Sequence, residues 1–478
     1  MASNKDAFKP TAGGDERIPI KEKVGYGLGQ IAGIFQGSIT DSLISPVFVL
    51  TLGVSPALIG VLNAIYRLWD AVTDLLMGWI SDNTRSRWGR RRPYLVLGAV
   101  LSGLWLPVMW LLNPHWSLQH LIVWMVCIQL GMFLFATIWN IPYQSLLLEM
   151  TQNTHERTNL AVTRQYIATF AWALMPWCWW LAQRPFFGDG GGKPDIIHGA
   201  LWIATIAGAL SIFFGVLPAL YCRERYYETA SRKQKIPLLK NIKLTFSNRS
   251  FLYLMGTSLL FIVGTNAKTG LALYTRVYYV CSGDTQLASL ITGYEGTIAT
   301  VLGLAGIPFF QWLSKRHGKR AAMTTIMSIV TLSSISTFFT YTPSYPYLSM
   351  VSGILLAPTA SAVWVLLPSM TGDIVDEDEL ITQFRREGSF AAVFSWVYKL
   401  AVSIGATLSG LLVMWAGFDE KLTVPQADSV LTTMRVLLVI VPTAFIAAAI
   451  YSSSRYPLTT QRMTEIRTDL EARRGHLH

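Results

Sequence analysis

The sequence predicts an all-α integral membrane protein that crosses the bilayer twelve times. Hydrophobic residues make up 52% of its 478 residues, charged residues only 14%, and the mean hydropathy is +0.39. These values lie far from those of soluble globular proteins. The apolar residues gather in runs that are long enough for a helix to span a bilayer, which takes about 20 residues. Basic residues are concentrated in alternate gaps between these runs.

The apolar runs are bounded by charge clusters and by turns that contain Pro or Gly. We expect each run to form a membrane-spanning helix. The expected spans cover approximately residues 24–52, 56–81, 93–113, 120–149, 159–183, 198–221, 251–280, 286–314, 320–341, 345–371, 388–417 and 428–452.

The charge of the gaps predicts the orientation of the chain. Arginine is abundant at 85–92 and in the long gap 223–249, whereas 113–119 and 342–347 contain no Lys or Arg. Because positively charged loops stay in the cytoplasm, the basic gaps are expected there. With an even number of spans, both termini are then cytoplasmic.

The spans divide into two halves of six. We expect a cytoplasmic tail (1–23), a first half (24–221), a basic cytoplasmic linker (222–250), a second half (251–452) and a C-terminal tail (453–478). Both halves place a Gly among basic residues after their second span, at Gly89 and Gly318. Repeated halves of this kind predict a central cavity and alternating access.

Several functional classes are disfavoured by the sequence. The net charge is +11, but the basic residues lie in short gaps between spans, so we expect no nucleic-acid binding. The four cysteines are isolated and form no metal or redox motif. No cluster of nucleophile and base and no phosphate-binding loop is present, so neither an enzyme nor a bound cofactor is expected.

A charged face within the second apolar run is the main candidate site. Arg67, Asp70 and Asp74 are three and four residues apart, so they share one face of a helix. Charges inside a membrane are costly and mark functional sites by default. The two acids need a counter-charge, a bound cation or a shared proton. The alternative is that Arg67 and the aspartates only neutralise one another inside the bundle.

Three long motifs resemble the glycoside-pentoside-hexuronide:cation symporters of the major facilitator superfamily. They are WDAVTDLLMGWISDNTRSRWGRRRP (69–93), IWNIPYQSL (138–146) and GDIVDEDELITQFRREGSF (372–390). The resemblance covers the whole chain. It implies cation-coupled symport of a sugar, glycoside or uronate, the major facilitator fold and a multi-pass protein of a bacterial-type inner membrane. The coupling ion is expected to be Na⁺, with H⁺ as the alternative, and the protein a monomer among membrane lipids.

The resemblance also implies a cation site built from oxygen ligands, which hard cations prefer. By position, the site comprises Asp70, Thr73, Asp74 and Thr137, with the two aspartates as metal ligands. Lys399 matches a lysine that the family places near the same cavity, where it can balance an empty cation site.

The positions that bind the sugar in the family differ here. Its acids correspond to Ile34 and Asn140, and one of its tryptophans to Gln144. A carbohydrate held by amides and aromatic rings is therefore expected. The candidate platforms are Trp139, Tyr143, Trp364 and Trp396. The expected solute-binding residues are Asp41, Asn140, Gln144, Arg164, Trp364 and Lys399.

Charged residues of the cytoplasmic gaps form a candidate inner gate. Ion pairs between the halves would close it in the outward-facing state, although single exposed pairs contribute only about 0–1 kcal/mol and a network is needed. The alternative is a solvated charged loop. The candidates are Glu156, Arg157, Asp373, Asp376, Arg385 and Glu387.

Three further possibilities remain open. Lys268 and Glu295 can form a structural pair between spans seven and eight. A carrier of lysolipids or other amphiphiles would need an apolar cleft open to the bilayer. A proton-driven exporter would differ in the direction of transport.

Overall fold

The computed structural model describes residues 18–151, 154–187, 195–225, 245–382, 386–419 and 426–474, and the regular structure in these ranges is helical. Short π or 3-10 turns lie at Ser45–Val49, Leu106–Trp110, Pro185–Phe187, Arg276–Val280 and Pro346–Ser349. The N-terminal group of helices is α1 (Ile20–Ile44), α2 (Pro56–Asn83), α3 (Arg92–Trp105), α4 (Leu118–Met150), α5 (Thr154–Leu174), α6 (Trp177–Ala182) and α7 (Ile196–Tyr221). The C-terminal group is α10 (Arg249–Thr275), α11 (Thr285–His317), α12 (Lys319–Thr340), α13 (Met350–Thr382), α14 (Glu387–Trp415) and α15 (Asp428–Ser454), followed by α16 (Thr460–Arg474).

In the described part of the chain, nine helices are long and apolar enough to cross a membrane. The all-helical membrane class is thereby confirmed, whereas the count of twelve spans stays a prediction. The remaining long helices are α1, α2 and α5, which coincide with expected spans but contain more polar residues. In α2 these include the charged face predicted from the sequence.

The expected span 159–183 is interrupted in the structure. Helix α5 ends at Leu174 and α6 begins at Trp177, with Pro176 between them. Proline lacks a backbone N–H group and clashes with the preceding turn, so it favours a break at this point. The expected linker at 222–250 runs largely through residues outside the described ranges, as do most of the expected N-terminal tail and the last four residues.

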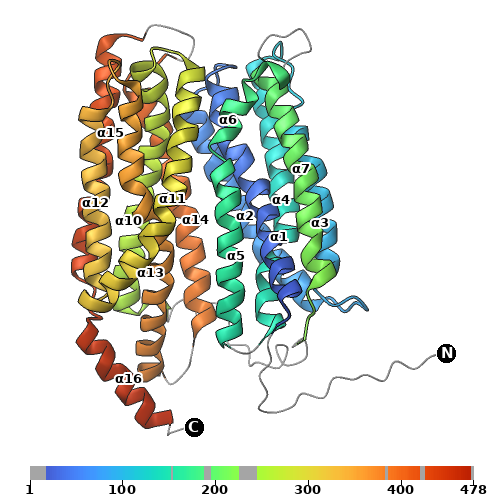
Figure 1. The fold of residues 1–478 in the computed structure, drawn as a ribbon, viewed down its shortest axis with the longest axis vertical. Coiled ribbons are helices and arrows are strands. Elements are labelled where there is room, and N and C mark those ends of the chain that lie inside the picture. Colours follow the sequence, from blue (N-terminus) through green and yellow to red (C-terminus); the bar gives the residue numbers. More distant parts are fainter. Residues whose placement is uncertain are drawn as a thin grey trace, which may run out of the picture.

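The long helices stand side by side as two groups (Figure 1). Helix α1 packs against α5 and α7, α10 packs against α14 and α15, and α2 packs against α14 across the two groups. We call the end of the bundle that carries the arginine-rich segment 85–92 the basic end. Helix α1 begins at this end, and α16 lies there beside the C-terminal group (Figure 1).

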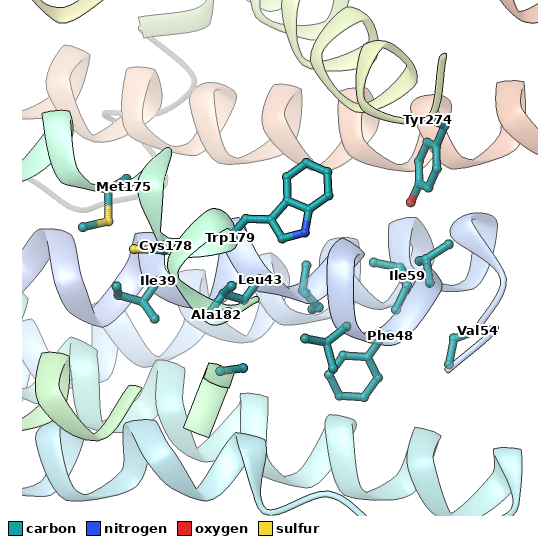
Figure 2. Close-up of a cluster of buried hydrophobic side chains, with 14 of the residues drawn as sticks. Ile39, Leu43, Phe48, Val54, Ile59, Met175, Cys178, Trp179, Ala182 and Tyr274 are labelled. Carbon is teal, nitrogen blue, oxygen red and sulfur yellow. The ribbon is translucent and has the colours of Figure 1, made fainter. Parts of the chain in front are cut away.

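The buried apolar residues form three cores. One lies in the N-terminal group around Tyr26, Trp139 and Tyr143, and another lies in the C-terminal group around Phe251 and Phe390. The largest core lies toward the end opposite the basic end and takes residues from both groups. Figure 2 shows Tyr274 of α10 in this core with residues of α1, α2 and α6. Among the described residues, the core that the two groups share lies toward that end.

The basic loop after α2 is held by two glutamates of its own group. The Glu224 carboxylate accepts the backbone N–H groups of Arg90 (2.8 Å) and Arg91 (3.0 Å) and caps the N-terminus of α3. Gly89 has φ of +97°, and a Cβ atom there would lie 2.5 Å from Glu224 Oε1. Glu149 Oε1 accepts 2.9 Å bonds from Nε of Arg90 and of Arg91. The loop is thus fixed to the ends of α4 and α7.

Candidate functional site

Two acids and one lysine meet between the helix groups. Asp70 and Asp74 lie one turn apart on α2, and Lys399 comes from α14 of the other group. The Lys399 Nζ atom is 2.7 Å from Asp70 Oδ2 and also forms an ion pair with Asp74 Oδ2. The side chains are 15–25% exposed. One ammonium thus bridges two carboxylates, which leaves the three groups with one negative charge when all are ionised.

Two buried threonines complete this cluster. The Thr137 hydroxyl of α4 lies 3.2 Å from Asp70 Oδ1 and 3.2 Å from Asp74 Oδ1. The Thr73 hydroxyl lies 3.3 Å from that of Thr137. The structure therefore brings together the four residues predicted to bind a cation, with Lys399 on the same carboxylates.

The donor set of this cluster consists of oxygen atoms. Carboxylate and hydroxyl oxygens suit a hard cation, and paired acids can instead share a proton. Within the described ranges, no group of three or more His, Cys, Asp or Glu residues could hold a metal ion. The carboxylate and hydroxyl oxygens of the cluster are chemically suited to a small hard cation or a shared proton.

Arg67 does not neutralise the two aspartates. Its Nη2 atom lies 3.7 Å from Asp41 Oδ2 of α1, and its guanidinium lies over the Phe133 ring at 5.5 Å. The alternative role proposed for Arg67 from its spacing is therefore wrong. Helical spacing places Arg67 near Asp70 along one face, but the long side chain reaches α1 instead.

Asn140 and Gln144 lie on an exposed face of α4, one turn apart, and Gln144 Nε2 donates a 3.0 Å hydrogen bond to Asn140 Oδ1. Asn140 follows Thr137 by three residues, so both lie on the same side of the helix. Trp364 of α13 is 52% exposed and meets the Tyr398 ring edge-on at 5.1 Å. Arg164 is half-buried on α5.

Two of the four candidate platforms for a sugar ring are buried. Trp139 donates through Nε1 to the Gly215 carbonyl (2.9 Å), and the Tyr143 hydroxyl donates to the Tyr26 carbonyl (2.7 Å). Their rings stack at 4.4 Å inside the N-terminal group. The platform role is wrong for both, because their side of α4 packs on α1 and α7. Ile34 is also buried, whereas Trp396 is 48% exposed.

The possible structural pair of Lys268 with Glu295 is not formed, and this alternative is wrong. Glu295 forms its ion pair with Arg276, which follows α10 directly. Lys268 is buried and donates from Nζ to the Ser333 hydroxyl at 2.7 Å. Arg276, which lies two turns after Lys268 in the chain, takes the place that was considered for Lys268. Helical spacing within one segment does not reveal such a contact with another helix.

The inner-gate candidates lie at the basic end. Glu156 Oε2 pairs with Lys23 (2.8 Å) and accepts the Ile18 N–H (2.9 Å), and the hydrogen bond from Lys23 is the main cause that lowers the pKa of Glu156. Asp373 of α13 pairs with Lys319 at 2.6 Å, and Asp376 lies one turn further along α13. These described pairs join residues of one group. The side chains of Arg157, Arg385 and Glu387 lie outside the described part.

Contacts between the groups are found at the opposite end. The Thr407 hydroxyl of α14 donates to the Gly60 carbonyl of α2 (2.9 Å), and a Cβ atom on Gly60 would lie 2.7 Å from Thr407 Cα. The Ser289 hydroxyl of α11 donates to Gln183 Oε1 at 3.2 Å. Trp177 donates to the Thr297 hydroxyl at 2.8 Å. The groups are therefore closed against each other at this end.

Two cavities lie beside the charged cluster. A polar cavity of about 260 Å³ is lined by α1, α2, α10 and α14, including Asp41 and Arg67. An apolar cavity of about 810 Å³ lies between α2 and α14 and is lined by residues such as Leu75, Trp396 and Leu400. Arg67 and Ser403 line both cavities. Apart from Asp41, the polar cavity's residues were not predicted as solute ligands, because they lie on four helices.

The sequence has recognisable relatives. A family model described as MFS/sugar transport protein matches residues 25–460. The chain is 24% identical to the isoprimeverose transporter of Lactiplantibacillus pentosus, over 84% of this chain and 81% of the relative. It is 25% identical to the glucuronide carrier protein homolog of Escherichia coli K12, over 96% of this chain and 97% of the relative.

Solved structures show a similar fold. A bacterial homologue of the human lysosomal transporter Spinster, in an inward-facing and unoccupied conformation, matches with a TM-score of 0.65 and 14% identity, over 96% of this chain and 99% of that one. A D-xylose-proton symporter matches with a TM-score of 0.60 and 14% identity, over 93% and 98% of the two chains. At such identities the similarity concerns the fold alone.

Proposed function

Because the chain belongs to the MFS/sugar transport family, whose model covers residues 25–460, we propose that it is a cation-coupled symporter of a sugar, glycoside or uronate. Membership makes it a transporter rather than an enzyme and an integral, multi-pass protein of the bacterial inner membrane. The resemblance to the glycoside-pentoside-hexuronide symporters is confirmed by this model and by relatives named for isoprimeverose and glucuronide. These names support a carbohydrate solute.

The bridge that Lys399 forms between Asp70 and Asp74 carries the proposal of cation coupling. The ammonium lies where an incoming cation would approach the carboxylate and hydroxyl oxygens of the four residues. A cation that binds these oxygens would take over the role of Lys399 and release its side chain. Because Lys399 belongs to the other helix group, cation binding would change a contact between the groups.

Coupling then follows from linkage. If a bound cation raises affinity for the solute, the solute raises affinity for the cation by the same factor. We assign solute contacts to Asn140, Gln144, Arg164 and Trp364, with the released Lys399 as a further donor. Na⁺ is the proposed cation, and H⁺ is the alternative that the paired acids allow.

The contacts between the groups support alternating access. If the basic end faces the cytoplasm, as the positive-inside rule requires, both termini lie inside and the structure is closed outward. It then corresponds to an inward-facing carrier. In the outward-facing state, the charged residues of the basic end would form ion pairs between the groups, with Glu156 and Asp373 exchanging their present partners.

The cation site is tested by ligand binding to the purified protein. Asp70→Asn and Asp74→Asn should each remove the effect of Na⁺ on thermal unfolding and on sugar affinity, when choline replaces Na⁺ at equal ionic strength. Asp428→Asn, in the first turn of α15, is the matched control and should keep the effect. A full Na⁺ effect in both site variants would contradict the proposal.

A carrier of amphiphiles is the second candidate, and the apolar cavity favours it. This cavity of about 810 Å³ lies between α2 and α14 and reaches Phe445 of α15. An acyl chain could occupy such a space while a polar head group lies between the helix groups. Competition experiments decide between the two functions. A lysolipid that is transported while isoprimeverose and glucuronides fail to compete would favour this candidate.

A further inference from the structure

The polar cavity is the strongest unassigned feature of the molecule. It is formed by α1 and α2 of one group and by α10 and α14 of the other. Along α2 it extends from Pro56 past Gly60, whose carbonyl accepts from Thr407, to Arg67, which is one turn from the charged cluster. We propose that this cavity is a subsite for one neutral glycosyl ring, an inference that depends on the proposed sugar transport. The residues that carry it are Asp41, Asn63, Arg67, Asn266, Thr269 and Ser403.

Asp41 and Arg67 offer the two complementary halves of a sugar contact. The carboxylate only accepts hydrogen bonds and the guanidinium only donates them. Their closest atoms are 3.7 Å apart, and their side chains are 56% and 28% exposed although both lie between helices. The pair is thus loose and open to the cavity. Two neighbouring hydroxyl groups of a sugar could donate to Asp41 and accept from Arg67, with hydrogen bonds strengthened by charge.

The neutral groups of the cavity have unused capacity. Asn266 Nδ2 donates to the Ile262 carbonyl (2.9 Å), which leaves its second amide hydrogen and its Oδ1 atom for a ligand. The hydroxyls of Thr269 and Ser403 donate to the carbonyls of Thr265 and Lys399, both at 2.9 Å. Their oxygen lone pairs can still accept. Among the described residues, the Asn63 side chain makes no hydrogen bond.

The size of the cavity limits the ligand. Drug-sized ligands occupy pockets of roughly 300–1,000 Å³, so a volume of about 260 Å³ suits a single sugar ring rather than a disaccharide. Because the walls come from both helix groups, a ring in this place would contact both. Its binding would therefore favour the arrangement in which the groups are closed outward.

The charges favour a neutral ring over a uronate. Asp41 and Arg67 are the charged residues that line the cavity, so its net charge is zero. The carboxylate of a uronate could form an ion pair with Arg67. It would also lie beside Asp41, and like charges at close range are unfavourable. Hydroxyl groups can satisfy both partners without this repulsion.

The subsite is connected to the charged cluster. Arg67 precedes Asp70 by three residues on α2, and Ser403 follows Lys399 by four on α14. A cation that releases Lys399 would act on the same two helices that line the cavity.

Sugar binding to the full-length purified protein tests the subsite. The probes are isoprimeverose, D-glucose, D-xylose and D-glucuronate, each titrated to high millimolar concentration in the presence of Na⁺, with thermal unfolding as the readout. A hydrogen bond to a charged group contributes roughly 10- to 100-fold in affinity and a neutral one roughly 2- to 10-fold. Asp41→Asn should therefore weaken binding of the best neutral sugar by about 10-fold or more, and Asn266→Leu by roughly 2- to 10-fold.

Thr269→Val is the mildest variant, because it removes one hydroxyl with little change in shape, and we expect a loss of about fivefold. Thr331→Val on α12 is its matched control, since its hydroxyl makes the same bond to a carbonyl one turn back (3.0 Å). The control should bind sugar normally. If Asn266→Leu does not fold, Thr269→Val decides the question.

The outcomes separate the subsite from the proposed function. Unchanged affinity in both Asp41→Asn and Thr269→Val, or a clear preference of the wild type for D-glucuronate over D-glucose, overturns the subsite alone. If none of the sugars stabilises the wild-type protein, the proposal of sugar transport and the proposal of the subsite are both refuted. A loss of affinity for the neutral sugar in the cavity variants, with normal affinity in Thr331→Val, supports the subsite.

Discussion

Replacing Lys399 by Gln should raise the affinity of the carrier for Na⁺. In the wild-type protein, a cation must displace an ammonium that contacts both Asp70 and Asp74. Removing one partner of a buried ion pair costs about 3–5 kcal/mol. We take the lower value because these side chains are partly exposed. About 3 kcal/mol corresponds to an affinity gain of about 100-fold, since each 1.4 kcal/mol is a factor of ten.

The same substitution should destabilise the cation-free protein. Without the ammonium, the two carboxylates have the Thr137 hydroxyl but no positive charge, so the unfolding temperature should fall in choline and recover in Na⁺. Isothermal titration of Na⁺ gives the affinity, and thermal unfolding in the two salts gives the stability. Lys399→Arg keeps the positive charge and serves as the control. Weaker or unchanged Na⁺ binding in Lys399→Gln would refute the competition between lysine and cation.

Three further predictions concern other parts of the structure. Thr137→Val removes the hydroxyl shared by the two carboxylates and should weaken Na⁺ binding by roughly 5- to 10-fold in titration, whereas Thr137→Ser should retain it. Gly60→Ala places a Cβ atom 2.7 Å from the α14 backbone and should open the outer contact, so that a cysteine at Asn63 reacts faster with a membrane-impermeant thiol reagent added outside. Glu156 has a lowered pKa because Lys23 donates to it, so its stabilisation is present above about pH 4.3 and is lost as the pH falls through the lower folded-state pKa. Glu156→Gln should therefore be less stable than the wild type at neutral pH, and the difference should shrink in acid; an equal difference at both pH values would contradict this assignment.

Much of the fold follows from the sequence. Long apolar runs separated by basic gaps predict membrane helices, because an exposed backbone polar group is too costly in lipid for other structures. The break at Pro176 lies inside an apolar run, so hydropathy alone did not reveal it. The face shared by Asp70 and Asp74 follows from helical geometry and lies as expected.

Contacts between distant segments were less predictable. Lys399 lies 325 residues from Asp74, and only the resemblance to a family indicated that they meet. Arg67 forms its ion pair with Asp41 of α1 rather than with the aspartates on its own face of α2, because its long side chain reaches the neighbouring helix. Trp139 and Tyr143 face inward and form hydrogen bonds within the N-terminal group. The sequence did not indicate this, because aromatic residues suit both a packed core and a solute platform. The walls of the polar cavity come from four helices, and no local spacing joins them.

Uptake driven by an imposed Na⁺ gradient tests the central claim most directly. Proteoliposomes that contain the wild-type protein are loaded with choline and diluted into radiolabelled isoprimeverose, with either Na⁺ or choline outside. We predict transient accumulation above equilibrium with Na⁺ outside, which Asp70→Asn abolishes while Asp428→Asn preserves it. Equal uptake in the two salts by the wild-type protein, or full Na⁺-driven accumulation by Asp70→Asn, would contradict a coupling site at the aspartate pair.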